Sequence, residues 1–319
     1  MTAPPATAAA TREAYAPTLI RLAQAGYDLV ALDADLSAST GGNKLAGVFP
    51  ERWYTVGAAE ANMVTMAAGL AAAGKIAFAA SFAVFVPGHS FDQVRMCIAQ
   101  PHLNVKLIAT HGGVSVGEDG ASAQAIEDLS LMTALPGFTV VVPADVVEAE
   151  QAIWTAGVTP GPFYVRLGRP KVPVIYDDRY QFRLGRAHQV RDGTDVTVIA
   201  CGHLVKPAID AADALAAAGI AVRVLNMATI KPLDEEAVLA AARETGAIVT
   251  AEEHLVQGGL GAAVARTLAL HYPVPMEQVG VWDRYGESGR WDQLMERFGF
   301  TPQGIEHAVR AVLPRKATP

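Results

Sequence analysis

The sequence has little cysteine. Only two occur in 319 residues, Cys97 and Cys201, and neither belongs to a C-x-x-C pair or to a metal-ligand spacing. Because both lie in apolar runs, we interpret them as buried thiols in a reducing compartment and expect no structural zinc. The scarcity of cysteine therefore predicts a cytoplasmic protein that binds no metal through its own residues.

Positive charge and long apolar runs are also scarce. The 25 basic residues are outnumbered by 32 acidic ones, for a formal charge of −7, so we expect no nucleic acid as a principal ligand. No stretch of about twenty residues is apolar throughout, which a bilayer-spanning helix would require. The opening MTAPPATAAA lacks the basic region and the apolar core of a secretory signal. We therefore expect no membrane partner and interpret the opening as a loose arm.

The chain is instead 51% hydrophobic and 18% charged, and its apolar periodicity predicts alternating helices and short buried strands. Acids follow the first strand, where open parallel sheets bind ligands, although capping of the next helix explains them equally well. In the first half we predict helices at 11–25, 59–73, 90–99, 128–134 and 146–156, and strands at 27–32, 54–56, 75–81, 105–110, 138–142 and 163–167.

The alternation lapses between residues 171 and 186, where Pro, Asp and Arg predict a linker. The fold class is therefore α/β, with two domains at 1–183 and 184–319, each a mostly parallel sheet flanked by helices. The glycines of 258–261 lack the G-x-G-x-x-G spacing of a dinucleotide site, so we assign them to tight helix packing. In the second domain we predict strands at 196–200, 221–226 and 247–250, and helices at 207–218, 233–245 and 261–271.

Several motifs follow one another along the chain. They are GAAEANM around Glu60, SFAVF from Ser81, THGGVSVGEDGASAQAIED from Thr110, RLGRPKVP from Arg166, and then TIKPLD, AEEH and GGLG. In this order they resemble the C-terminal half of transketolase, a thiamine-diphosphate enzyme, from residue 12 to residue 312. The resemblance implies a pyrimidine-binding domain followed by a transketolase C-terminal domain.

Transketolases carry a further N-terminal domain that binds the coenzyme diphosphate through Mg²⁺ and a G-D-G…N motif, and this motif does not occur in the sequence. A diphosphate requires a divalent ion on oxygen ligands, or helix N-termini. The resemblance therefore implies the small subunit of a split transketolase, active only with a large subunit that binds Mg²⁺ and the diphosphate. An α2β2 heterotetramer is the expected assembly.

By resemblance, Glu60 is the catalytic acid that holds N1′ of the coenzyme's aminopyrimidine. Without the resemblance, it could be a solvated acid that complements a helix dipole. Burial beside apolar neighbours such as Met63 would favour the protonated form that this chemistry needs. Phe82 and Phe85 match the aromatics that bind the ring, with Phe85 the expected stacking partner, although core packing is the usual role of such side chains. Asp35 matches an acid near the thiazolium.

The resemblance also implies transfer of a two-carbon ketol unit from a ketose phosphate to an aldehyde. The GED loop, residues 117–120, would present Asp119 to a substrate hydroxyl, and Glu118 would make structural or subunit contacts. We expect His89 and His254 to be structural. Arg166 competes with Arg169 for one role in the set implied to bind the substrate phosphate, which is Arg12, Ser39, His111 and Arg169.

Ala123 departs from the family, in which a His or Gln at this position hydrogen-bonds the donor's terminal hydroxyl. Its loss would cost about 1 to 3 kcal/mol of differential binding. A contact from the partner could replace it, or the donor could be another ketose, or the acceptor something other than a sugar phosphate.

Other classes of protein remain as alternatives. One is another two-chain thiamine enzyme, similar to the β subunit of a 2-oxo-acid dehydrogenase or to deoxyxylulose-phosphate synthase. Arg12 and His111 argue against the dehydrogenase, whose substrates carry no phosphate. A noncatalytic assembly subunit is the alternative from outside the enzymes, and the retained Glu60 argues against it.

Overall fold

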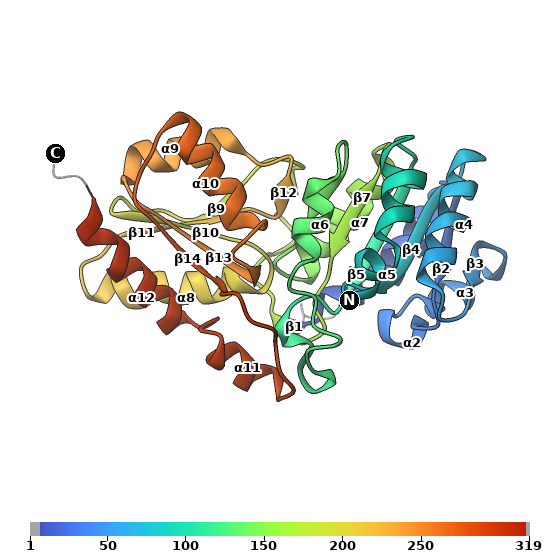
Figure 1. Ribbon diagram of the computed structural model, residues 1–319, viewed down its shortest axis with the longest axis horizontal. Coiled ribbons are helices and arrows are strands. Elements are labelled where there is room, and N and C mark those ends of the chain that lie inside the picture. Colours follow the sequence, from blue (N-terminus) through green and yellow to red (C-terminus); the bar gives the residue numbers. More distant parts are fainter. Residues whose placement is uncertain (1–6, 317–319) are drawn as a thin grey trace.

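The computed structural model describes residues 7–316 as two α/β units that lie side by side (Figure 1). Within the two sheets, only the edge strands β12 and β9 run antiparallel to their neighbours, which confirms the predicted fold class. The first sheet has the order β12 (Thr229–Lys231), β6 (Thr139–Val141), β7 (Phe163–Arg166), β5 (Val105–Thr110), β4 (Ile76–Phe82), β2 (Leu29–Asp33) and β3 (Trp53–Thr55). The second has the order β14 (Met276–Val281), β13 (Ile248–Leu255), β10 (Val196–Ala200), β11 (Val222–Asn226) and β9 (His188–Arg191).

Helices cover both faces of the first sheet, because its strands are apolar on both sides. In β2, Leu29 packs into one layer and Val30 into the other. One layer holds α1 (Tyr15–Gln24) and α7 (Val146–Val158); the other holds α4 (Glu60–Ala72), α5 (Phe85–Gln93) and α6 (Asp128–Ala134). Shorter segments are α2 (Ser37–Thr40), α3 (Asn43–Ala46), a π-helical turn (Val94–Ala99) and 3-10 turns at Thr11–Ala14, Pro50–Arg52 and Val114–Asp119.

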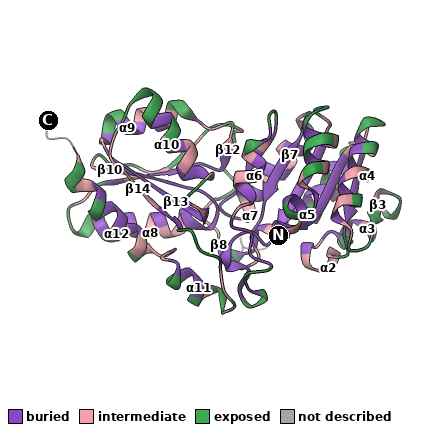
Figure 2. Cartoon of the chain, in the orientation of Figure 1, coloured by how far each residue is buried: buried purple, intermediate pink, exposed green. Residues whose placement is uncertain are grey.

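The second unit is layered in the same way. Its helices are α8 (Val205–Ala217) and α12 (Pro302–Val312) on one face, α9 (Glu235–Thr245) and α10 (Leu260–His271) on the other, and α11 (Trp291–Arg297) against the 3-10 turn of the GED loop. Val238 of α9 and Leu260 of α10 belong to the same buried cluster as Met63 of α4, so the cores of the two units are continuous. The central strands of both sheets are buried, whereas the edge strands β3 and β9 and the outer helix faces are partly exposed (Figure 2).

The junction between the units differs from the sequence-based expectation. Strand β12 lies beyond the predicted linker, yet it pairs with β6 and so extends the first sheet. Three residues are too few to show a strand alternation, which is why the pattern did not reveal it. The first sheet takes its edge strand from the second half of the chain. The predicted domain boundary between residues 183 and 184 therefore stays a prediction.

The opening is not wholly the loose arm that we expected. Residues 1–6 lie outside the described part of the chain, but Ala8 and Ala9 form β1 (Ala8–Ala9), which pairs with β8 (Val172–Pro173). Ala9 and Ala10 are buried. Small side chains next to the predicted linker therefore attach the opening to the first unit.

The two cysteines differ in burial. Cys201 is buried as expected, but Cys97 is only partly buried, so the prediction for Cys97 was wrong in degree; neither cysteine forms a disulfide. Among the helices of residues 7–316, none has the length and apolar character to cross a bilayer.

Candidate functional site

Glu60 is a buried acid at the start of a helix. It is the first residue of α4 and is 8% exposed, above the fully buried Met63. Nδ1 of His89, on α5, lies 3.0 Å from its Oε2. The other oxygen, Oε1, has no hydrogen-bond partner within residues 7–316. Glu60 therefore presents one engaged and one free carboxyl oxygen, and is not the solvated acid of the simpler interpretation.

A set of stacked aromatic rings is connected to this acid through His89. Phe82 ends β4 and Phe85 begins α5, so the tight strand-to-helix turn holds their rings 5.7 Å apart at an interplanar angle of 12°. The ring of His89 stacks on Phe85 at 4.9 Å, and that of His111 stacks on Phe82 at 3.8 Å. Flat apolar rings beside a carboxyl with a free oxygen fit an aminopyrimidine, which needs an apolar face and an acid.

Three of the four residues implied to bind phosphate lie together. Nη1 of Arg12 donates to the carbonyl of Ser39 at 2.5 Å and to Nε2 of His111 at 3.2 Å. The ring's other nitrogen, Nδ1, lies 2.8 Å from Oγ1 of Thr110. Burial, and then the charges of Arg12 and Arg169, lower the pKa of His111 to about 3. His111 is therefore a neutral imidazole whose two nitrogens already have partners.

Arg169, the fourth residue, connects this group to the GED loop. It donates to the carbonyl of Val116 and, at 3.3 Å, to Glu118, and it lies 3.8 Å from Asp119. Its side chain is 34% exposed. The pKa of Arg12 is lowered by burial and then by the positive charge of Arg169.

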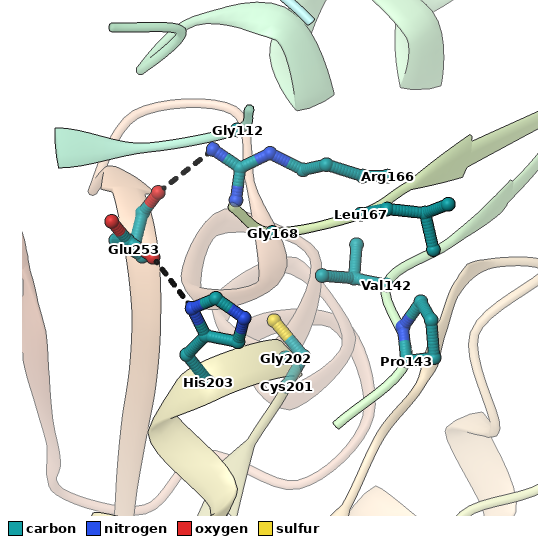
Figure 3. Close-up of a pocket in the computed structure, with 10 residues that line it drawn as sticks. All are labelled: Gly112, Val142, Pro143, Arg166, Leu167, Gly168, Cys201, Gly202, His203 and Glu253. Atoms are coloured by element: carbon teal, nitrogen blue, oxygen red, sulfur yellow. Dashed lines mark hydrogen bonds and ion pairs between the residues drawn. The ribbon is translucent and has the colours of Figure 1, made fainter. Parts of the chain in front are cut away.

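Arg166, the competitor, is committed elsewhere. Its side chain is 5% exposed, and Nε lies 2.9 Å from Asp128. Nη2 donates to the carbonyls of Ala125 and Glu253 at 2.8 and 3.0 Å. Figure 3 shows the guanidinium directed at β13 beside His203, around a cavity of about 10 Å³, roughly the size of one water. These contacts favour Arg169 as the residue that meets a ligand.

The GED loop exposes two acids on a turn whose backbone requires glycine at both ends. Gly117 and Gly120 both have positive φ, at 87° and 76°, which a side chain would strain. Glu118 and Asp119 between them are exposed. Ala123 is 8% exposed, and its methyl group can form no hydrogen bond.

The acids after β2 have separate roles. Oδ1 of Asp33, the last residue of β2, accepts from the backbone N–H of Leu36 at 2.7 Å, and its Oδ2 accepts from Thr40 at 3.3 Å, whereas α2 itself begins without a side-chain cap. Asp35 is exposed, with a positive φ of 64°. Within residues 7–316 its carboxylate has no hydrogen bond or ion pair, including none with Glu60.

Sequence reasoning missed several residues that hold the site. Gln124 donates to the carbonyls of Val114 and Glu287 at 3.1 and 2.9 Å, and Oε1 of Glu253 accepts from the N–H of Ser115 at 2.5 Å. The second unit thereby fixes the loop of the first. His89 could have been found from its i, i+4 spacing to Phe85 on a helix.

Other polar residues of the second unit have internal partners. Nε2 of His254 accepts from the N–H of Leu129 at 3.2 Å, at the start of α6. Glu252 accepts from the N–H groups of Leu260 and Gly261 at 2.7 Å each, so a carboxylate already occupies the N-terminus of α10. A Cβ on Gly259 would lie 2.0 Å from that carboxylate, which explains this glycine by close packing.

Comparisons with known proteins agree with this geometry. The family model for the transketolase pyrimidine-binding domain matches residues 7–174, and that for the transketolase C-terminal domain matches residues 185–305. A putative transketolase C-terminal section from Methanocaldococcus jannaschii is 41% identical over 93% of this chain and 94% of that protein. The 6-deoxy-6-sulfo-D-fructose transketolase subunit SqwH of a Clostridium species is 43% identical over 96% and 95%.

A solved structure is also similar. A split-gene transketolase, described as an inactive beta4 tetramer, superposes with a TM-score of 0.88 at 45% identity, over 97% of this chain and 99% of that one. The chain thus consists of a transketolase pyrimidine-binding domain followed by a transketolase C-terminal domain. The chain belongs to the transketolase family, which confirms the resemblance, and within it is similar to the small subunits of split members.

Proposed function

We propose that this chain is the small subunit of a two-chain, thiamine-diphosphate-dependent transketolase, which transfers a two-carbon ketol unit from a ketose donor to an aldehyde acceptor. The observation that carries the proposal is the buried carboxyl of Glu60, with Oε1 free and Oε2 in contact with His89, whose ring stacks on that of Phe85 next to Phe82. An acid and a flat apolar face are the two features that the base of thiamine requires.

Each side chain has a role at one end of the coenzyme or substrate. Glu60 would hold N1′ of the base and exchange a proton with it, and Phe85, with Phe82 next to it, would support the ring. When bound, thiamine diphosphate supplies the nucleophilic carbon at which the ketose is cleaved. Asp35, exposed after β2, would lie near the thiazolium, as the family resemblance implies.

The substrate's anionic end would bind away from the reacting carbon. Arg12 and Arg169 supply charge-assisted donors, and the neutral His111 adds a ring that can donate once its bond to Thr110 is exchanged. Ser39 supplies a hydroxyl next to the carbonyl that Arg12 already binds, and Asp119 accepts from a substrate hydroxyl. A tetrahedral oxoanion suits this set, and the name of the Clostridium relative indicates a sulfonated sugar for that protein.

A separate large subunit completes the site in this proposal, binds Mg²⁺ and the diphosphate, and forms an α2β2 heterotetramer with this chain in the cytoplasm. Relatives that match this chain over nearly their whole length are named as a subunit or a C-terminal section, and the similar solved tetramer of β chains is described as inactive. Both facts support a requirement for a partner.

The test is to combine the chain with a candidate large subunit, thiamine diphosphate, Mg²⁺, xylulose 5-phosphate and ribose 5-phosphate, and to measure triose phosphate release. Glu60→Gln should lower the rate about 10²- to 10⁴-fold, whereas Glu51→Gln, at an exposed acid before β3, should leave it unchanged. Wild-type turnover by the Glu60→Gln complex would remove the proposed role. Release of CO₂ from a 2-oxo acid instead would favour the dehydrogenase alternative.

A further inference from the structure

His89 contacts Glu60 although its own position is open to solvent. Its side chain is 55% exposed, against 10% for Glu60, and yet Nδ1 lies 3.0 Å from Oε2. An exposed imidazole has no need of a protein partner, because water can satisfy both of its nitrogens. The contact therefore calls for a reason beyond the packing of α5.

The ring of His89 is held in place by stacking on Phe85. Phe85 and His89 are i, i+4 neighbours on α5, and their rings are 4.9 Å apart at an interplanar angle of 18°. Directly after His89, Ser90 leaves helical geometry, with φ −138° and ψ 26°. Stacking restricts rotation of the imidazole, and the helix kink ends the segment that presents it to α4.

The consequence falls on the orientation of the Glu60 carboxyl. A carboxyl with one oxygen hydrogen-bonded cannot rotate freely, so its second oxygen keeps one direction. Within residues 7–316, that second oxygen, Oε1, has no other partner. A neutral imidazole that donates from Nδ1 also leaves its Nε2 directed away from Glu60.

We propose that His89 is a positioning residue for Glu60: its Nδ1–H holds Oε2 and so directs Oε1 at the base of thiamine. This inference rests on the proposed function of Glu60. An alternative predicts the opposite effect on coenzyme binding: a ring that stacks on Phe85 and contacts Glu60 could instead occupy the place of the base. In that case removal of His89 would strengthen coenzyme binding.

The first test uses the chain alone and nuclear magnetic resonance of the imidazole nitrogens at neutral pH. We expect the Nδ1–H tautomer for His89 in the wild type, and the Nε2–H tautomer common to free histidine in Glu60→Ala. His307, exposed on α12, serves as the control and should not respond. The same tautomer at His89 in both proteins would overturn the proposal.

The second test uses the complex with the large subunit. His89→Ala should weaken the binding of thiamine diphosphate with Mg²⁺ and lower kcat by about ten- to a hundredfold, and leave the KM of the ketose unchanged. His89→Asn, whose amide nitrogen can replace Nδ1, should recover part of the loss, and added imidazole should restore part of the activity of His89→Gly. Tighter coenzyme binding by His89→Ala, or an unchanged kcat, would overturn the positioning role.

A Glu60→Gln complex measured in parallel separates the two proposals. If it is inactive while His89→Ala behaves as wild type, only the role of His89 is wrong. If it keeps full activity, the proposed function of Glu60 fails, and the role of His89 fails with it.

Discussion

Arg12 donates a hydrogen bond to Nε2 of His111 across 3.2 Å. Since a guanidinium can only donate, this nitrogen must accept, so the proton of the neutral ring lies on Nδ1, which faces Thr110. The bond therefore fixes both the charge and the tautomer of His111, in agreement with its lowered pKa of about 3.

The first prediction concerns stability against pH. The pKa of His111 lies below its ordinary value of 6.5, so between these values the unfolded chain binds a proton that the folded chain does not. Stability should therefore fall as the pH drops from about 6.5 toward 3. His111→Asn, which tolerates the positive φ of this position, should remove about 2 kcal/mol of the loss between pH 6.5 and 4.5.

Urea unfolding at pH 6.5 and 4.5 measures this difference, with His307→Asn as a control at an exposed histidine. An equal acid sensitivity of wild type and His111→Asn would contradict the neutral state of His111.

The second prediction concerns the substrate's anionic end. Arg12→Ala should raise the KM of a ketose phosphate by about ten- to a hundredfold, with little change in the binding of thiamine diphosphate. Arg21→Ala is the matched control, because Arg21 lies on α1 with its side chain half exposed, where it pairs with Glu150 and lies over the ring of Trp154. If Arg12→Ala weakens only the binding of thiamine diphosphate, Arg12 does not bind the substrate's anionic end.

The third prediction concerns the hydrogen bond that Glu253 of the second unit accepts from the N–H of Ser115 in the first unit. Glu253→Gln removes a buried charge next to Arg166 and weakens the acceptor for the N–H of Ser115. We expect faster amide hydrogen exchange across residues 114–120 and a higher KM for the ketose. Glu244→Gln, at the exposed end of α9, should change neither. Unaltered exchange in the loop would mean that the second unit does not hold it.

The fourth prediction concerns Ala123. If its methyl group accounts for a missing contact to the donor, Ala123→His should raise kcat/KM for xylulose 5-phosphate by about ten- to a hundredfold. Ala121→His, in the same loop but exposed, is the control. A decrease for Ala123→His would indicate that the site is shaped for a different donor or acceptor.

Periodicity was enough to predict the strands of the first sheet except β12, because each buried strand is a short apolar run of ordinary length. It did not reveal β9, whose residues are half-buried or exposed, or β14, whose first three residues are half-buried, nor the final helices α11 and α12. It also began α5 at residue 90, whereas the helix begins at Phe85. Proline at position 87 argues against a helix in the pattern but is tolerated in a first turn.

The residues of the site were likewise predicted only in part from the sequence. The motifs led to Glu60, Phe82, Phe85 and the group around Arg12, because residues matched to a family lie at strand ends that the fold brings together. They did not lead to Gln124 or Glu253, whose roles depend on contacts between distant segments, and they gave His89 only a structural role. Spacing along the chain does not encode such contacts.

The most direct test of the account is the binding of thiamine diphosphate with Mg²⁺, measured by calorimetry on the chain alone and on its complex with the large subunit. The account predicts tight binding by the complex and at least a hundredfold weaker binding by the chain alone, since a hydrogen bond from one acid and a stacking surface amount to only a few kcal/mol. Tight binding and ketose turnover by the chain alone would contradict it.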